Sequence, residues 1–257
     1  MTQSISFNSA AEFYDRTRAL PPEVQAQVTL LLAQELKGRG PCIEVGIGTG
    51  RIALPLREAG VEMLGVDLSL PMLARLDENA GGRGLLAAQA DATRLPFADH
   101  SFGAALACHV LHLIPDWRLA AAEMVRVTRP GGVLLIDHST GTDAWQELTR
   151  RFFQDVPNHR WPVGLDRVED LDAEMAALGA GLRQLQPIEA VHRGAIGARI
   201  ENLEQGIFAA CWDLSPEVRR RAAAATRRWA VQRYGSLGTE VESKQSIVWR
   251  AYDLRSP

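Results

Sequence analysis

The sequence has few cysteines, no long apolar run and no excess of charge of either sign. Its 257 residues include three cysteines, Cys42, Cys108 and Cys211, far apart and in apolar surroundings. This pattern excludes a disulfide framework and a zinc site built on cysteines. The formal net charge is −3, so charge gives no reason to expect binding to nucleic acid or to an anionic membrane.

Lysine is also scarce, since only Lys37 and Lys244 are lysines among the 28 basic residues. We attach no function to this composition. The most apolar stretch, 104–114, is shorter than the roughly 18 residues of a membrane-spanning helix, and it contains His109 and His112. The N-terminus lacks the basic head and apolar block of a secretory signal. We therefore expect a cytoplasmic protein.

The first 140 residues alternate short apolar runs with helical patterns. The runs typical of buried strands are 41–46, 61–67, 85–89, 101–107 and 133–137, and the helical patterns between them are 51–59, 69–79 and 116–127. Residues 129–132 have the composition of a turn. Continuous apolar strands separated by helices imply a parallel sheet covered on both faces. We predict an α/β, doubly wound, Rossmann-like fold.

After this sheet the pattern becomes irregular. Segments 143–153 and 166–178 are helical, 181–191 and 244–254 alternate like strands, and the stretch 195–234 between them is helical. The late strands make seven in all and predict an antiparallel edge. We expect one domain over 1–257, with a cofactor-binding core at 8–138 and helical insertions at about 139–165 and 195–243 that form a lid or substrate region.

The most informative segment is Glu44-Val-Gly46-Ile-Gly48-Thr-Gly50-Arg51, where the first strand becomes the first helix. Glycines there allow a tight turn and let a ligand approach the backbone. A dinucleotide fingerprint needs its third glycine at the position of Arg51. The acid at Glu44 suits a ligand that carries positive charge, such as an ammonium or a sulfonium. The alternative is a glycine-rich turn without a ligand.

Acidic residues follow the next two strands at matching places. Asp67 ends the second strand, where a carboxylate can accept both hydroxyls of a ribose. Asp91 and Ala92 follow the third strand, where a carboxylate and a backbone amide can bind an adenine edge. Segment 107–112 follows the fourth strand and is expected to face the same crevice. Singly, either aspartate could instead be a helix N-cap.

Together these features resemble a known family, the class I S-adenosylmethionine-dependent methyltransferases of the type 11, ubiquinone/menaquinone-biosynthesis-like branch. The resemblance covers about residues 8–138, and the segments that carry it are 44–50, 66–69, 90–102, 109–116 and 127–132. It implies a seven-stranded methyltransferase sheet and S-adenosyl-L-methionine as cofactor, with S-adenosyl-L-homocysteine as product.

The resemblance also implies roles for individual residues around the cofactor. The backbone of Gly46, Gly48 and Gly50 would contact the methionine part, with Glu44 near its ammonium. The other implied contacts are Asp67 to the ribose, Leu68 and Met72 to the adenine, Asp91 and Ala92 to the adenine edge, Cys108 and His109 beside the sulfonium, and Tyr14 in a segment that closes over the cofactor. Tyr14 could instead only pack an amphipathic helix.

Three histidines, His109, His112 and His138, lie at or just past the ends of the fourth and fifth strands. A neutral imidazole near pH 7 is a common general base and could deprotonate a hydroxyl or an amine. The alternative is that these histidines only line the site, because alignment and desolvation can supply most of the acceleration. We expect no metal, since His109 and His112 straddle a strand end and a loop.

Large aromatic side chains cluster in the sequence beyond the sheet. They are Trp145, Phe152, Phe153, Trp161, Phe208 and Trp212. Core packing explains most of them, and an aromatic-lined lid over an apolar acceptor is the alternative.

We expect methyl transfer from S-adenosylmethionine to a small-molecule O, N or C acceptor, by direct displacement aided mainly by positioning and desolvation. A cofactor-binding protein without turnover and a nicotinamide-dependent oxidoreductase are the alternatives. The acceptor and the oligomeric state do not follow from the sequence.

Overall fold

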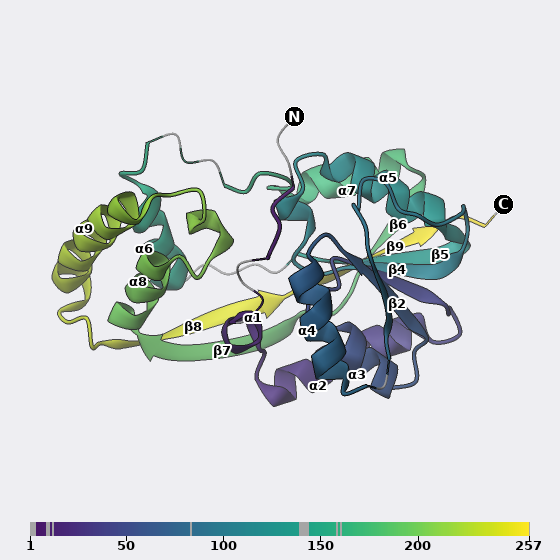
Figure 1. The fold of residues 1–257 in the computed structure, drawn as a ribbon, viewed down its shortest axis with the longest axis horizontal. Coiled ribbons are helices and arrows are strands. Elements are labelled where there is room, and N and C mark those ends of the chain that lie inside the picture. The colour runs from purple at the N-terminus through teal and green to yellow at the C-terminus, as the bar shows by residue number, and fades with distance from the viewer. Residues whose placement is uncertain are drawn as a thin grey trace. The chain divides into compact units, whose positions relative to one another are not determined.

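The computed structural model describes residues 4–8, 11, 13–82, 84–138, 144–157, 159 and 161–256 (Figure 1). The described residues form two compact units. The first lies within 1–138, 162–188 and 248–257, and the second lies within 139–161 and 189–247. The second unit therefore contains most of the two predicted insertions and also two strands. None of the described helices is long and apolar enough to cross a membrane.

The first unit is built on a seven-stranded sheet in the order β3-β2-β1-β4-β5-β9-β6. Its strands are β1 (Cys42–Val45), β2 (Met63–Asp67), β3 (Leu86–Gln89), β4 (Phe102–Ala107), β5 (Thr128–Asp137), β6 (Ala180–Gln184) and β9 (Trp249–Leu254). Strands β1 to β5 pair in parallel, and β9 is antiparallel to both β5 and β6. This confirms the predicted doubly wound, mostly parallel sheet with antiparallel pairing near one edge.

Helices cover both faces of this sheet, as its apolar strands require. They are α2 (Pro22–Leu36), α3 (Ala53–Glu58), α4 (Leu70–Ala80), α5 (Trp117–Val127) and α7 (Val168–Ala177), with a short α1 (Tyr14–Arg18) near the N-terminus. Helices α2 and α3 lie on one side of the sheet, and α5 and α7 lie on the other (Figure 1). Ser69 caps α4, because its hydroxyl accepts a hydrogen bond from the Met72 amide at 3.3 Å.

The predicted turn at 129–132 is wrong in one respect, because these residues lie inside β5. The register of β5 on β4 shifts there, from Phe102 opposite Thr128 to Ala104 opposite Val133. Gly131 has φ +76°, a conformation that glycine adopts without steric cost. The chain thus makes an irregular excursion within the strand and resumes pairing two residues further along β4.

The two late strands were also predicted wrongly, since each segment is divided between two sheets. Segment 181–191 spans β6 and β7 (Ile188–Ala195), and segment 244–254 spans β8 (Glu240–Ile247) and β9. Strands β7 and β8 form a separate two-stranded sheet in the second unit. The period of two continues across the second break, where Ile247, Trp249 and Ala251 are buried, but it fails at the first, where the buried residues Leu185 and Ile188 are three apart. Pro187, which has no amide hydrogen, stands in the first break and was a second available signal.

The second unit packs its helices around a core of its own. The helices are α6 (Ala144–Phe153), α8 (Ile196–Gln205) and α9 (Pro216–Tyr234), with a short 3₁₀ turn at Ala209–Cys211. Leu148 and Phe152 from α6 and Ile200 from α8 are fully buried in this core. Ser215 caps α9 by accepting from the Val218 amide at 3.3 Å. The predicted helical stretch 195–234 is confirmed.

Candidate active site

A cleft lies in the first unit, at the edge of the sheet where ligands of open α/β folds bind. Its walls come from residues at the carboxyl ends of β1, β2, β3 and β4, joined by residues of the N-terminal segment and of the turn after β4. Ten predicted cofactor-binding residues line it: Tyr14, Gly46, Gly48, Asp67, Leu68, Met72, Asp91, Ala92, Cys108 and His109. Four other predicted site residues, all described by the structure, do not line the cleft: Glu44, Gly50, His112 and His138.

The loop after β1 brings glycine backbone to the wall of the cleft. Gly48 has φ +56°, and a Cβ added there would lie 3.2 Å from Cε of Met72. Gly46 has φ +73°, and its added Cβ would lie 2.6 Å from Val110. Both positions therefore need glycine, for conformation and for space. A side chain at either would stand on the surface that the cleft exposes.

Gly50 needs glycine for a different reason. Its φ is +86°, and an added Cβ would lie 2.8 Å from Cγ of Leu54 and would also overlap Leu76. Both leucines belong to the helices that flank the loop, so Gly50 lets helix and loop pack closely. The expected contact of the Gly50 backbone with the cofactor stays a prediction.

Glu44 is buried beside Val45 of the cleft wall, with a relative exposure of 2%, and does not itself line the cleft. It accepts a hydrogen bond from the backbone of Ala53 at the start of α3, and burial raises its pKa to about 8 although Arg51 opposes this. Its Oε2 has no hydrogen-bond partner among the described residues. The expected contact between Glu44 and a ligand ammonium stays a prediction.

Two aspartates of the cleft hold backbone as well as lining it. The carboxylate of Asp67 accepts from the amides of Gly48 and Ser69, both at 2.8 Å. Burial raises the pKa of Asp67, and these amide bonds oppose the rise. Asp91 accepts from the amide of Thr93 at 2.9 Å and from its hydroxyl at 2.8 Å. Asp67 thus joins the glycine loop to the start of α4.

Helix α1 is fixed over the glycine loop by residues that the sequence analysis missed. Asp15 accepts from the Thr49 hydroxyl at 2.5 Å and from the Asn79 amide at 3.0 Å. Tyr14, the residue before Asp15, lines the cleft and makes an edge-to-face contact with Phe7, with 5.8 Å between the ring centroids. Thr49 and Asn79 lie 34 and 64 residues from Asp15 in the chain, so no local sequence motif predicts these contacts.

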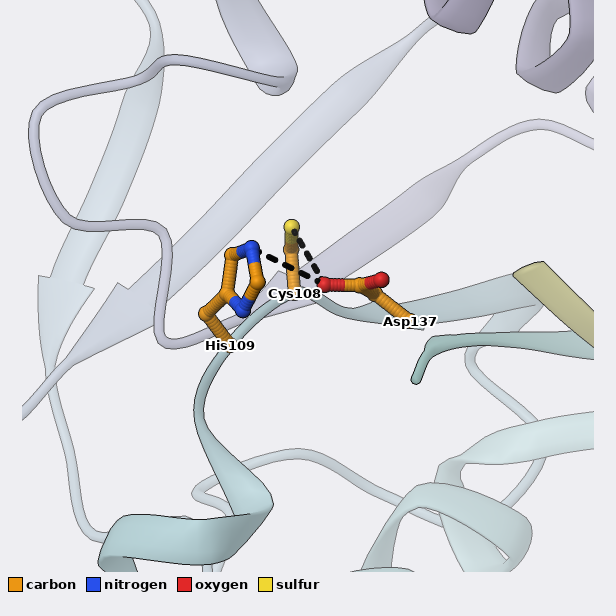
Figure 2. A group of neighbouring side chains, drawn as sticks. All are labelled: Cys108, His109 and Asp137. Atoms are coloured by element: carbon orange, nitrogen blue, oxygen red, sulfur yellow. Dashed lines mark hydrogen bonds and ion pairs between the residues drawn. The ribbon is translucent and has the colours of Figure 1, made fainter. Parts of the chain in front are cut away.

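Three polar side chains meet where β4 and β5 end, and we call them the His109 cluster (Figure 2). They are Cys108, His109 and Asp137. Nε2 of His109 lies 3.1 Å from Oδ2 of Asp137, and Sγ of Cys108 lies 3.7 Å from the same oxygen. The sequence analysis missed Asp137, because its partner Cys108 lies 29 residues away in the chain.

The donor atoms of the His109 cluster lie within 4.8 Å of one another, a set that could hold a metal ion. Against this, the Arg51 guanidinium donates to Sγ of Cys108 at 3.2 Å and brings positive charge to the same place. Burial also raises the pKa of the Cys108 thiol well above its usual range, whereas a metal binds the thiolate. We interpret the group as a hydrogen-bonded cluster.

The other two candidate histidines have different surroundings. His112 lies in a 3₁₀ turn at Leu111–Leu113, and burial lowers its pKa to about 4. His138 follows β5, and its amide donates to the Val248 carbonyl at 2.9 Å. Burial lowers the pKa of His138 as well. Of the three histidines, His109 is the one that lines the cleft.

Comparison with known proteins identifies the part of the chain that carries this cleft. Residues 43–136 match the family described as a methyltransferase domain. This segment is similar to the class I, type 11 methyltransferases. The cofactor of this family is S-adenosylmethionine.

Two curated relatives of this segment are named for their methyltransferase activities. A demethylmenaquinone methyltransferase from Renibacterium salmoninarum is 34% identical over 133 residues, which are 51% of this chain and 55% of that protein. A phosphatidylethanolamine N-methyltransferase from Cereibacter sphaeroides is 38% identical over 104 residues, 38% of this chain and 51% of that protein. The chain thus spans about half the length of these relatives.

A solved structure extends the similarity of fold beyond the methyltransferase domain. The YcgJ protein from Bacillus subtilis superimposes with a TM-score of 0.62 and 18% identity, over 90% of this chain and 100% of that one. At this identity the comparison concerns the fold alone.

The residues of the cleft fit S-adenosylmethionine chemically. The missing Cβ of Gly48 leaves backbone open to a ligand. Asp67 and Asp91 place carboxylates, which accept hydrogen bonds from hydroxyl and amino groups, at the ends of two neighbouring strands. Leu68 and Met72 add apolar surface between them. The individual contacts stay predictions.

Proposed function

We propose that the chain transfers a methyl group from S-adenosylmethionine to a small-molecule acceptor, and that the cleft holds the cofactor. The observation that carries this proposal is the convergence of a glycine loop, Asp67, Asp91 and His109 from four strand ends on one cleft. Ligands of open α/β sheets bind at this place. The similarity to two relatives named as methyltransferases supports the proposal.

When bound, S-adenosylmethionine supplies a methyl group activated by a sulfonium, whose electron pair stays on sulfur as the carbon–sulfur bond breaks. The chain's own residues bind and orient the reactants. Asp67 and Asp91 would accept hydrogen bonds from the nucleoside, and the backbone at Gly46 and Gly48 would follow the methionine part. Apolar side chains of the N-terminal segment, Ile5 and Phe7, line the cleft and would exclude water from the reacting atoms.

Calorimetric titration of a glycine variant tests the cofactor half of the proposal. Gly48→Val should abolish binding of S-adenosylhomocysteine, because the new side chain fills the surface that a ligand needs. Gly60→Val is the matched control, since Gly60 also has positive φ, +88°, but an added Cβ meets nothing within 4 Å. If both variants fold and Gly48→Val still binds as well as wild type, the loop is only a structural turn.

Incubation with methyl-labelled S-adenosylmethionine tests the transfer half. We expect label in a small-molecule product, with no dependence on added nicotinamide cofactor. Tight cofactor binding without transfer to a broad set of O, N and C nucleophiles would favour a binding protein instead.

A further inference from the structure

His109 combines an unusual backbone conformation with a position on the cleft wall. Its φ is +52°, in the left-handed region that non-glycine residues seldom adopt. Such strain persists where the surroundings fix the residue, and it is concentrated at functional sites. The side chain of His109 is 38% exposed and lines the cleft, whereas that of Asp137 behind it is 1% exposed.

The contact with Asp137 sets the tautomer of the ring. A carboxylate only accepts hydrogen bonds, so Nε2 of His109, 3.1 Å from Oδ2 of Asp137, carries the hydrogen. Nδ1 of the neutral ring then has the free lone pair, and within the described part of the chain no hydrogen bond to it is found. A histidine held through one nitrogen by a buried carboxylate is the arrangement that prepares the other nitrogen to take a proton.

We propose that His109 is the general base of this methyltransferase and that Asp137 is the residue that positions it. The acceptor of such a base attacks through an acidic hydroxyl. This rests on the proposed function. The hydroxyl proton passes to Nδ1 of His109, and the electron pair of the broken O–H bond stays on the acceptor oxygen as its nucleophilic pair. The imidazolium that forms lies against the Asp137 carboxylate, and it later releases the proton to water.

The surroundings favour a hydroxyl on an apolar ring. Apolar side chains line the cleft beside His109, from the N-terminal segment and from the turn after β4: Ile5, Phe7, Val110, Leu113 and Ile114. A neutral imidazole is a weak base, so it deprotonates a phenolic or enolic hydroxyl more readily than an aliphatic one. 1-Naphthol is a suitable probe, since it joins an acidic hydroxyl to a flat apolar ring.

The charged groups around the ring set its pH response. Asp137 raises the pKa of His109, while burial and the guanidinium groups of Arg51 and Arg18 lower it, and the net shift is downward. Cys108 and His112 are the other titratable neighbours, and both are uncharged near pH 7. His109 is therefore neutral, and able to accept a proton, at pH 7 and above.

Glycine at position 109 separates the chemical role from the structural one. His109→Gly removes the imidazole and also relieves the positive φ, which offsets the loss of the contact with Asp137, so its Tm should stay within a few degrees of wild type. Because His109 also lines the cleft, S-adenosylhomocysteine binding is measured beside kcat, and the affinity of the variant should fall much less than its kcat. Its kcat with 1-naphthol should fall roughly 100-fold or more, the usual effect of losing a general base. Added imidazole should restore part of the rate.

His100 supplies the matched control, because it is the other described histidine with positive φ, +59°, and it does not line the cleft. His100→Gly should keep the wild-type kcat. An unchanged kcat in His109→Gly, or equal losses in both variants, overturns the assignment. Absence of transfer to 1-naphthol by a wild-type chain that methylates other nucleophiles overturns the acceptor class. Absence of all transfer overturns the proposed function and this inference with it.

Asp137→Asn gives a readout that does not depend on turnover. In ¹⁵N NMR of the imidazole ring, wild-type His109 should be the Nε2–H tautomer in the presence of S-adenosylhomocysteine. The variant should titrate at a lower pH, because a negative charge beside the ring is lost. The acidic limb of the kcat/KM profile should move in the same direction. An unchanged tautomer and an unchanged titration would show that Asp137 does not position His109.

Discussion

Asp67 shows how one side chain can build a loop and also serve a ligand. It holds the amides of Gly48 and Ser69, and so connects the turn after β1 with the first turn of α4. The same carboxylate faces the cleft at the end of β2. Its removal therefore withdraws a ligand contact and loosens the glycine loop together.

Asp67→Ala should weaken S-adenosylhomocysteine binding by roughly 1–3 kcal/mol, the scale of hydrogen bonds to a charged group. Calorimetry measures this directly. Asp77→Ala is the control, since Asp77 is exposed on the neighbouring helix α4 and does not line the cleft. If a folded Asp67→Ala protein and the control bind S-adenosylhomocysteine with equal affinity, Asp67 does not contribute to ligand binding.

Glu44 leads to a prediction about stability and pH. Its pKa in the folded chain is raised to about 8 from an ordinary 4.5, so the folded chain keeps a proton that the unfolded chain loses. The free energy of unfolding should then decrease as pH rises from about 4.5 to about 8, and this contribution should level off above that pH. Glu44→Gln keeps the shape and has no proton to lose, so its Tm should rise relative to wild type between pH 5 and pH 9.

The control for this prediction is Glu23→Gln, because Glu23 is exposed in the first turn of α2. Its Tm difference from wild type should be nearly constant over the same pH range. A Glu44→Gln difference that stays constant as well would show that Glu44 is ionised in the folded chain at pH 7.

At the scale of elements, α1 is the smallest helix that touches the cleft, and its position depends on Asp15. Five residues are too few for a helix to be stable by itself, so the bonds from Asp15 to Thr49 and Asn79 must hold it. Asp15→Ala should free this segment and lower the affinity for S-adenosylhomocysteine several-fold, with a change in Tm of only a few degrees.

The measurement is calorimetry beside a thermal melt, and Thr49→Val is the companion variant. If Asp15 acts through Thr49, the two substitutions should be less than additive in the double variant. Wild-type affinity in Asp15→Ala would mean that the N-terminal segment does not contribute to binding.

The elements were predictable where local chemistry decides them. Strands β1 to β4 follow apolar runs, so the sequence analysis located all four of them. The breaks between β6 and β7 and between β8 and β9 depend on which sheet each strand joins. Alternation continues unchanged past the second break, so it could not reveal that one, whereas the spacing of three between Leu185 and Ile188 marks the first.

The candidate site was predictable to a similar extent. Gly48, Asp67 and Asp91 follow strand ends at characteristic spacings, and the structure brings them to one cleft. Gly50 and Glu44 belong to the same motif, but tertiary packing gives them other neighbours, namely Leu54 with Leu76 and the start of α3. Asp15 and Asp137 were missed because their partners are distant in the chain.

At the scale of the whole molecule, the chain divides its residues between two compact units. The cleft is lined by residues of the first unit. We expect the second unit, which contains α6, α8 and α9, to act as the lid or substrate region. Cofactor binding and acceptor choice would then be separable by mutation.

Phe208 and Trp212 test this division of roles. Phe208 stacks on the Arg199 guanidinium at 4.1 Å and packs on the core of the second unit. Phe208→Ala should therefore lower Tm by about 5 °C, as large-to-small changes in packed regions do. The indole of Trp212 donates to the Gly206 carbonyl at 2.9 Å. Trp212→Ala should change acceptor turnover with little effect on S-adenosylhomocysteine affinity.

Thermal melts and cofactor titrations of both variants, run beside an acceptor assay, provide the comparison. A loss of stability alone, without any selective change in acceptor use, would show that these aromatic side chains only pack the second unit.

The central claim is that the cleft binds S-adenosylmethionine. Isothermal titration of the wild-type chain with S-adenosylmethionine, S-adenosylhomocysteine and NADH tests it most directly. We predict saturable binding of the first two ligands at one site per chain, and no binding of NADH at the same concentrations. Binding of NADH without binding of either S-adenosyl ligand would contradict the account.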